Sequence, residues 1–466
     1  LTGVRGRAPV LPATIRRKKM FDKILIANRG EIAVRIIHAC RELGIRTVAV
    51  YSEADRGALH AQIADEAVCI GPAATKDSYL NIQSILAACE VTGAEAIHPG
   101  FGFLSENSSF VKTCELCGVT FIGPSPKSMD MMGDKAHAKQ TMRRAGVPVV
   151  PGSDGVVTDI EEAKKIAAQI GYPVMVKASA GGGGRGIRKV DDERELESAM
   201  TAAKTEALSF FGDDGVYIEK FIVNPRHVEI QLLADKFGNV VHLGERDCSV
   251  QRRNQKMIEE SPSPIMTPEL RHRMGTAARA AATACGYYNA GTVEFLVDSD
   301  LNFYFMEMNT RIQVEHGITE LVSGIDLVKN QILIAAGEPL SFTQQDIELR
   351  GHAIECRINA ESPQLNFRPS PGKIESLHMP GGNGIRIDSA VYSGYEITPY
   401  YDSMIAKVMA YAPTRDEAIQ KMKWALAEFI VEGIDTNIDF QLDLLRDKDF
   451  EAGNVDIGFL QRKGYC

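Results

Sequence analysis

The sequence lacks both a long apolar run and an excess of basic charge. No stretch approaches the roughly 20 consecutive apolar residues that a membrane-spanning helix needs. Acidic residues outnumber basic ones, which gives a formal net charge of −9, whereas a nucleic-acid-binding surface needs a clustered basic excess. These absences predict a protein that acts neither in a membrane nor on nucleic acid, and that holds any anionic ligand through local cations.

Cysteine is also sparse. The chain has nine cysteines in 466 residues and no evenly spaced disulfide framework, so we expect reduced thiols and a cytoplasmic location. Its only CxxC motif, Cys114 to Cys117, has no second pair at zinc-ribbon spacing. Because Phe110, Val111, Cys114 and Cys117 recur at helical spacing, the pattern favours a buried helix face over a metal site.

The length of the chain exceeds the size of a single hydrophobic core, so two to three folded units are expected. Residues 1–19 carry six basic residues and no acid, and they precede the first strand pattern. We expect them to be a disordered leader or a cloning remnant outside the fold.

Short apolar runs alternate with helical patterns from Lys23 to about Pro124, which predicts a doubly wound parallel sheet of the α/β class. Ligands of such sheets bind beyond the carboxyl ends of the strands. Residues 28–31 and 98–101 would lie there, so they are candidate substrate contacts. The expected strands are at residues 24–28, 47–52, 67–71, 96–100 and 120–125.

A glycine run follows the predicted strand that ends at Lys177. Glycines let backbone N–H groups approach phosphate oxygens, so the run is a candidate phosphate loop. It also matches G-x-G-x-x-G, but that dinucleotide fingerprint opens a helix, whereas residues 187–190 have a strand pattern. We therefore expect a flap that joins two strands over phosphates; a flexible turn is the alternative. The glycines are Gly181, Gly182, Gly183 and Gly184.

A predicted hairpin, residues 291–297 and 303–309, carries Glu294 on one strand and Glu307 on the other. Carboxylates on neighbouring strands can bridge two magnesium or manganese ions that also hold ATP phosphates. A solvated face with alternating charges is the alternative. If the chain stays extended, alternation places these side chains on one side: Glu307, Asn309, Arg311, Gln313 and Glu315.

Further cations lie in residues 245–256 and at Arg357, where surface ion-pair networks are the alternative explanation. His227 could contact a nucleotide, although a lone histidine is more often structural. The sequence has neither a G-x-S-x-G nucleophile motif nor a GK[ST] phosphate loop. These features favour metal-assisted phosphoryl transfer.

Eight motifs in this order resemble the ATP-grasp biotin carboxylases: IANRGEIAVRI, HPGFGFLSEN, MGDKAHAK, KASAGGGGRGI, NPRHVEIQ, ERDCSVQRRNQK, EMNTRIQVEH and ECRINAE. The resemblance runs from Met20 almost to the C-terminus. It implies an N-terminal domain over residues 20–134, an ATP-grasp region over 135–336 with a lid at about 150–221, and a mixed α/β C-terminal domain over 350–461.

The resemblance also implies a role for individual residues. The ATP contacts would be Lys135, Lys177, the four glycines, Glu219, Lys220, His227 and Gln251, together with Glu294 and Glu307. The metal ligands would be Glu294, Glu307 and Asn309. Bicarbonate would be held by Lys256, Arg311, Gln313 and Val314 and deprotonated by Glu315, and biotin would meet Arg357, Phe101 and Gly102.

The implied reaction uses ATP, two Mg²⁺ or Mn²⁺ ions and bicarbonate, and carboxylates biotin on a carrier protein. The expected setting is acetyl-CoA carboxylase in fatty-acid synthesis, with carboxyltransferase partner subunits and a homodimeric enzyme. The alternatives are another acyl-CoA carboxylase and a catalytically silent subunit. A different ATP-grasp ligase would lack the RIQVEH and ECRIN segments, and both are present.

Three positions bear on these expectations. Phe101 stands where relatives usually carry tyrosine, which removes a hydroxyl near the expected biotin pocket. Gly317 stands where they usually carry proline, so the backbone after Glu315 is expected to be less restricted. Lys421 lies in a helical pattern rather than in the hairpin that biotin attachment favours, so biotin is expected to arrive on another protein.

Overall fold

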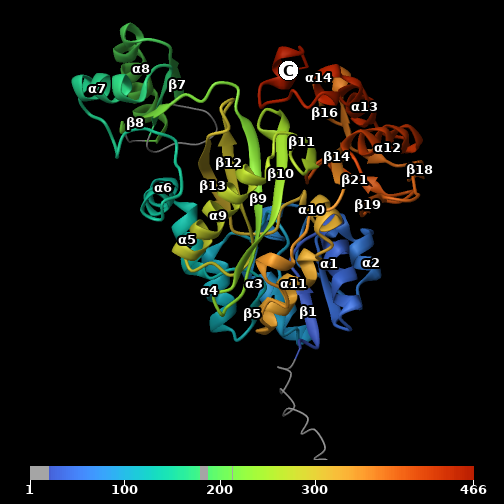
Figure 1. The fold of residues 1–466 in the computed structure, drawn as a ribbon. Helices are drawn as coiled ribbons and strands as arrows, with labels where there is room; N and C mark the ends of the chain where they lie inside the picture. Colours follow the sequence, from blue (N-terminus) through green and yellow to red (C-terminus); the bar gives the residue numbers. More distant parts are fainter. Residues whose placement is uncertain (1–19, 179–186, 212–213, 466) are drawn as a thin grey trace, which may run out of the picture.

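The computed structural model describes residues 20–178, 187–211 and 214–465, without the side chains of residues 135, 136, 210 and 211 (Figure 1). Three sheets of different size organise this part of the chain: a five-stranded sheet, an eight-stranded sheet and a three-stranded sheet. None of the helices in the described ranges is long and apolar enough to cross a membrane.

The five-stranded sheet has the order β3-β2-β1-β4-β5 and is parallel throughout, which confirms the predicted doubly wound α/β unit. β1 is buried along its whole length, as expected for a strand covered on both faces. The strands are β1 (Lys23–Ile26), β2 (Arg46–Tyr51), β3 (Glu66–Cys69), β4 (Ala96–His98) and β5 (Thr120–Phe121), and the helices are α1 (Gly30–Glu42), α2 (Leu59–Ile63), α3 (Ile82–Thr92), α4 (Ser108–Leu116) and α5 (Pro126–Gly133).

The prediction that Cys114 and Cys117 share a buried helix face is half wrong. Cys114 is buried in the core of the parallel unit, but Cys117 is exposed. α4 ends at Leu116, and Cys117 is its C-cap, so the helical periodicity stops before this residue. All cysteines from residue 20 to residue 465 are free thiols.

The eight-stranded antiparallel sheet is the centre of the molecule, with the order β13-β12-β9-β10-β11-β14-β21-β19. One apolar cluster joins it to the parallel unit, because Ile32 and Ile36 of α1 pack with Leu233 of β9. The strands are β9 (Arg226–Ala234), β10 (Val240–Arg252), β11 (Gln255–Ser261), β12 (Asn289–Val297), β13 (Phe303–Asn309), β14 (His352–Asn359), β19 (Ile385–Ser389) and β21 (Met404–Ala412), and the accompanying helices are α6 (Lys135–Arg144), α9 (Pro268–Ala284), α10 (His316–Ser323) and α11 (Leu327–Ala336).

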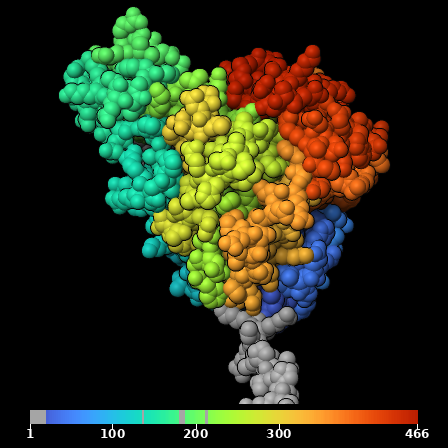
Figure 2. All heavy atoms as spheres, viewed as in Figure 1, coloured from blue at the N-terminus to red at the C-terminus, as the bar shows by residue number. Residues whose placement is uncertain are grey.

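The three-stranded sheet, in the region expected to be the lid, has its own apolar core, built from residues such as Val174, Leu196 and Ile218. It projects as a separate lobe (Figure 2). β6 (Val174–Ala178) pairs antiparallel with β7 (Ile187–Val190), so the glycine run does connect two strands, as predicted; the run itself lies outside the described residues. The other lid elements are β8 (Val216–Lys220), α7 (Ile160–Ile170) and α8 (Glu193–Phe211).

The C-terminal part adds helices and short strands around β14, β19 and β21. Its core combines strand residues such as Ile354 and Val408 with helix residues such as Met422 and Leu445. Lys421 lies within a helix, as the sequence pattern predicts. The helices are α12 (Arg415–Glu428), α13 (Ile438–Arg446), α14 (Lys448–Glu451) and α15 (Phe459–Arg462), and the short strands are β15 (Glu361–Ser362), β16 (Arg368–Pro369), β17 (Gly372–Lys373), β18 (Ser376–His378), β20 (Glu396–Ile397) and β22 (Ile430–Glu432).

Candidate active site

A β-bulge in the β12–β13 hairpin places two acids opposite each other. Phe295 pairs with Phe305. The residue before Phe295 in β12, Glu294, pairs with Glu307 and not with Met306, so Met306 is the extra residue of the bulge. Directly opposed residues of an antiparallel pair point to the same face. The bulge therefore keeps Phe305 in the apolar core and turns Glu307 to the face that carries Glu294.

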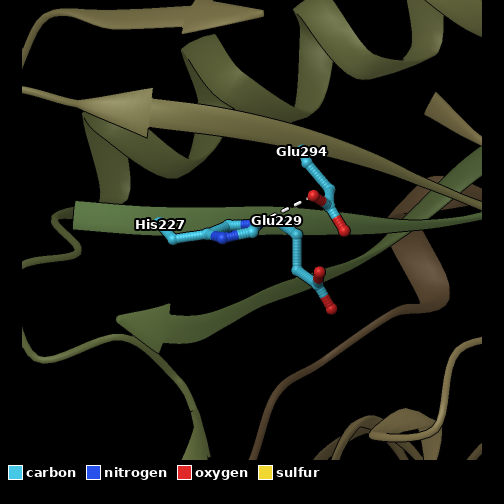
Figure 3. Close-up of side chains that lie close together, drawn as sticks. All are labelled: His227, Glu229 and Glu294. Atoms are coloured by element: carbon cyan, nitrogen blue, oxygen red, sulfur yellow. Dashed lines mark ion pairs between the residues drawn. The ribbon is translucent and has the colours of Figure 1, made fainter. Parts of the chain in front are cut away.

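Glu294 is the meeting point of side chains from three segments. Its Oε2 lies 3.0 Å from Nε2 of His227, which reaches it from the neighbouring strand β9 (Figure 3). Its Oε1 accepts hydrogen bonds from Asn309 Nδ2 at 2.9 Å and from Gln313 Nε2 at 3.0 Å. Gln251 joins the group, because its Nε2 donates to Nδ1 of His227 at 2.6 Å. Three predicted site residues thus contact one carboxylate, and Gln251 holds one of them.

The Lys256 ammonium lies among three acids. Its Nζ is 2.6 Å from Glu229 Oε2, 2.7 Å from Glu315 Oε1 and 3.1 Å from Glu294 Oε1. Burial alone would lower the pKa of Lys256, but the anionic groups around it raise that pKa well above its usual range. Glu229 is fully buried and also pairs with Arg246 at 2.6 Å. The cluster is therefore a dense, charge-compensated centre in which Lys256 stays cationic.

Glu315 reaches this centre by a different route from the predicted one. The extended path holds only to Asn309, where β13 ends; the chain then bends, and Glu315 becomes the N-cap of α10. Its Oε2 lies 2.9 Å from a terminal nitrogen of Arg357. Burial would raise the pKa of Glu315, but Lys256 and Arg357 hold it well below its usual range. Glu315 is consequently an anionic group between two cations.

Arg311 is oriented by a residue that the sequence patterns did not single out. Glu106, in the loop after β4, accepts a hydrogen bond from Arg311 Nε at 3.0 Å and another from the Thr310 amide at 2.9 Å. Arg311 also donates to Gln313 Oε1 at 2.7 Å and to Asn309 Oδ1 at 3.1 Å. Glu106 belongs to the HPGFGFLSEN motif, but the separation of 205 residues between Glu106 and Arg311 conceals the contact in the sequence.

The two predicted ligand loops of the parallel unit lie side by side. Nδ2 of Asn28 donates to the carbonyl oxygens of Pro99 and Phe101, at 2.7 Å each. The Phe101 ring is half-buried against the core that α1 shares with β9, and Gly102 is exposed with a φ of 69°. Both lie in the same loop as Glu106. The contact between Glu106 and Arg311 holds this loop against the site.

A second group of predicted residues lies on the lid. Nζ of Lys177 on β6 is 2.6 Å from Oε2 of Glu219 on β8, and Lys139 of α6, which the sequence analysis did not identify, pairs with the same carboxylate. Nζ of Lys220 instead donates to the carbonyl oxygen of Gly171 at 3.0 Å. The glycines of the flap and the side chain of Lys135 lie outside the described residues.

Gly317, which is expected to leave the backbone after Glu315 less restricted, lies beside Met409. It lies in the first turn of α10, and a Cβ atom at this position would collide with Sδ of Met409 on β21. Met409 therefore fills the space that a larger residue would need. The helical backbone after Glu315 is maintained without proline.

The oxygen ligands of the hairpin suit a magnesium or manganese ion. Such hard cations prefer carboxylate and amide oxygens, and Glu294, Glu307 and Asn309 supply them from neighbouring strands. Two other groups have ligand atoms within 4.8 Å of one another: His227, Glu229 and Glu294 (Figure 3), and Glu229, Cys248 and Glu315. The imidazole of the first group and the thiol of the second suit softer metals, so the all-oxygen set of the hairpin fits a hard ion better.

Family models match nearly the whole chain. Residues 20–129 match "Biotin carboxylase, N-terminal domain", residues 134–343 match "Carbamoyl-phosphate synthase L chain, ATP binding domain", and residues 355–462 match "Biotin carboxylase C-terminal domain". Biotin carboxylase 1 of Bacillus subtilis is 59% identical over 95% of this chain and 98% of its own length. The chain belongs to the biotin carboxylase family. It is accordingly an enzyme, an ATP-dependent ligase that carboxylates biotin with bicarbonate.

Other biotin carboxylase relatives agree in sequence and in structure. A pyruvate carboxylase subunit of Methanothermobacter thermautotrophicus is 57% identical over 95% of this chain and 90% of its own length. The biotin carboxylase of Campylobacter jejuni, solved as a beta-gamma-ATP complex, is 52% identical with a TM-score of 0.88, covering 95% of this chain and 99% of that one. The biotin carboxylase domain dimer of Hydrogenobacter thermophilus 2-oxoglutarate carboxylase, solved with MgADP, ADP and bicarbonate, is 53% identical with a TM-score of 0.87, covering 96% and 98%.

Proposed function

We propose that this biotin carboxylase transfers a carboxyl group from bicarbonate to biotin on a separate carrier protein, as the first half-reaction of acetyl-CoA carboxylase in fatty-acid synthesis. The observation that carries the proposal is the Lys256 centre. An ammonium group contacts three carboxylates there, and one of these, Glu315, also contacts Arg357. Such a centre places cationic groups beside a deprotonated carboxylate, as the binding of an anion next to a base requires.

In this proposal, Lys256 and Arg311 bind bicarbonate with Gln313 and the backbone of Val314. Glu315 takes the proton of the bicarbonate hydroxyl as that oxygen attacks the γ-phosphorus of ATP. The low pKa of Glu315 keeps it in the deprotonated form that a general base needs, and it also lowers the basicity of the carboxylate. The products of this step are carboxyphosphate and ADP, and the cationic groups oppose the charge that develops on the oxygens.

Glu294, Glu307 and Asn309 would hold two magnesium or manganese ions. When bound, these ions would neutralise the charge on the ATP phosphates. We assign nucleotide binding to Lys177, Glu219, His227 and Gln251, with Lys135, Lys220 and the glycine flap completing the cleft. The Lys177–Glu219 pair on the lid supports this assignment, because lid closure would bring its charges over the nucleotide and exclude water from a labile intermediate.

The second step needs a base for the ureido nitrogen of biotin and a cation for the anionic oxygen that results. Carboxyphosphate decomposes to carbon dioxide and phosphate, and the released phosphate is the base in this proposal. The Arg357 guanidinium stabilises the oxygen. Its Nε donates to Glu259 at 2.6 Å, which helps to fix the orientation of the guanidinium. Phe101 and Gly102 would line the biotin pocket.

A second candidate is the same half-reaction in a complex that carboxylates a different acceptor. Relatives that match almost the whole chain include a 2-oxoglutarate carboxylase domain and a pyruvate carboxylase subunit. The acceptor is selected by partner carboxyltransferase subunits, so the described site fits either complex. A reconstituted complex would be offered acetyl-CoA, other acyl-CoA esters and 2-oxo acids, and the acceptor that is carboxylated decides between them. We also propose a homodimer, which the dimeric 2-oxoglutarate carboxylase domain supports.

The test is ATP hydrolysis by the purified protein with magnesium. We expect hydrolysis that depends on bicarbonate and that free biotin stimulates. Good ATP binding without any stimulation by biotin or by a biotinylated carrier would overturn the proposal and favour a catalytically silent subunit. A magnesium chelator should abolish hydrolysis, which controls for contaminating activities that need no metal.

A further inference from the structure

Lys407 is a fully buried lysine that contacts the loop of the active site from the C-terminal side. It lies on β21, opposite Arg357 of β14 and opposite Asp388 of β19 in strand register. Its side chain has an exposed fraction of 0%. Its Nζ donates a hydrogen bond to the backbone carbonyl oxygen of Val314 at 2.7 Å. The group held by Lys407 is therefore the peptide that immediately precedes Glu315.

The charge of Lys407 is compensated by acids from two other parts of the chain. Its Nζ lies 3.3 Å from Oε1 of Glu31 and 3.6 Å from Oδ2 of Asp388. Glu31 belongs to α1 of the parallel unit, and its side chain is 4% exposed. Within the described residues neither Glu31 carboxylate oxygen has a hydrogen-bond partner, so the ion pair with Lys407 is the polar contact that the structure gives it.

Nζ of Lys407 connects three parts of the chain. Glu31 comes from the parallel unit, Lys407 from the C-terminal strands, and Val314 from the segment that follows the acid hairpin. Burying a lysine costs free energy that partners must offset, and an apolar pair of similar volume is often at least as stable. Stability alone therefore gives a weak reason for a buried Glu31–Lys407 pair. The hydrogen bond from Lys407 to the Val314 carbonyl oxygen gives a stronger reason for the pair, because Val314 precedes Glu315.

We propose that Lys407 is a positioning residue for the bicarbonate subsite, with Glu31 as the carboxylate that holds its ammonium in place. The inference rests on the proposed function, which assigns bicarbonate binding to residues 311–314. A carbonyl that accepts a charged hydrogen bond fixes the orientation of its peptide plane. Fixing the Val314 peptide sets the direction of the backbone that bicarbonate would meet, and it sets the start of α10, from which Glu315 projects.

The variant Lys407→Met removes the donor while keeping most of the side-chain volume. We expect the KM for bicarbonate to rise about 10-fold or more, as loss of a charged hydrogen bond predicts. The dissociation constant for ATP should stay within about 2-fold, because the lid residues Lys177 and Glu219 do not contact Lys407. The matched control is Lys421→Met, which removes another lysine that donates to main-chain carbonyls, those of Asn383 and Tyr411, away from the site.

Lys407→Met also leaves buried acids uncompensated, so its stability can fall. The double variant Lys407→Met with Glu31→Gln removes both charges and should recover most of the lost thermal stability. A positioning role predicts that the bicarbonate KM stays raised in the double variant, because the Val314 carbonyl is still without its donor. The single variant Glu31→Gln should raise this KM less than Lys407→Met, because Asp388 still compensates the lysine.

Two outcomes would overturn the inference. One is a bicarbonate KM that returns to the wild-type value together with stability in the double variant, which would make the role purely structural. The other is an equal rise in the KM for bicarbonate and the dissociation constant for ATP. The wild-type protein separates this inference from the proposed function. If wild type shows no bicarbonate-dependent turnover, the proposed function has failed; if wild type is active and Lys407→Met matches it, only the positioning role has failed.

Discussion

The Lys256 ammonium and the Glu315 carboxylate form a buried ion pair, with Nζ 2.7 Å from Oε1. The two residues are 59 positions apart in the chain and come from β11 and from the N-cap of α10. This pairing has a chemical consequence for a general base. Lys256 helps to keep Glu315 anionic, although burial acts in the opposite direction.

Replacing Lys256 with Met should lower kcat/KM for bicarbonate by at least about 100-fold, because a group that stabilises developing charge is lost. It should also raise the pKa of Glu315. A base works only when deprotonated, so the acidic limb of the pH–rate profile should move to higher pH. The measurement is residual turnover as a function of pH. An acidic limb at the wild-type position would show that Lys256 does not set the protonation state of Glu315.

Glu307→Gln should abolish turnover, because it would remove a charged oxygen ligand from the proposed metal set on the hairpin. The matched control is Asp300→Asn, an exposed acid in the turn of the same hairpin, which should retain wild-type turnover. ATP hydrolysis would be measured over a range of magnesium concentrations. Full activity of Glu307→Gln at all concentrations would remove Glu307 from the metal set.

Glu106→Gln should raise the KM for bicarbonate by about 10-fold, because the charged hydrogen bond that orients Arg311 is weakened. The KM for ATP should change little. The control Glu90→Gln neutralises an exposed acid on α3 in the same unit and should have no effect. Steady-state kinetics with each substrate varied in turn would check the split. An equal rise in both KM values would argue for a general disturbance of the fold.

His60 should make the parallel unit less stable in mild acid. It is fully buried, and burial lowers its pKa from 6.5 to about 4. The unfolded chain therefore binds the proton more readily, so the stability from neutral His60 is complete above pH 6.5 and is lost progressively as the pH falls from 6.5 to about 4. Between about pH 7 and pH 5 the free energy of unfolding should fall by about 2 kcal/mol from this residue.

The check on His60 is urea unfolding followed by circular dichroism at the two pH values. His60→Gln should reduce the difference between them by about that amount, whereas His378→Gln, at an exposed position on β18, should not. A pH dependence that is unchanged in His60→Gln would assign the loss of stability to other groups.

The sequence patterns predict the parallel sheet, the lid strands and the hairpin well, because each has local periodicity and clear turn residues. The same reasoning could not identify Glu106 or Lys407. Both act through contacts with residues far away in the chain, and a single acid or lysine in a loop or a strand has no distinctive spacing. The chain path to Glu315 was missed for a related reason: alternation describes a strand only until the strand ends, and β13 ends at Asn309.

Strict alternation also places Phe305 and Glu307 on one face, which is incompatible with one side chain in the core and the other among charged groups. The bulge at Met306 resolves this conflict. Its consequence concerns chain length. Deleting Met306 would restore regular pairing and leave Glu307 opposite Glu294, because the residues on either side of the bulge keep their partners. Pairing Met306 regularly through a one-residue slip of the strand would instead turn Glu307 toward the apolar interior, with every acid still present in the sequence. The hairpin should therefore tolerate the loss of Met306 better than a shift of register.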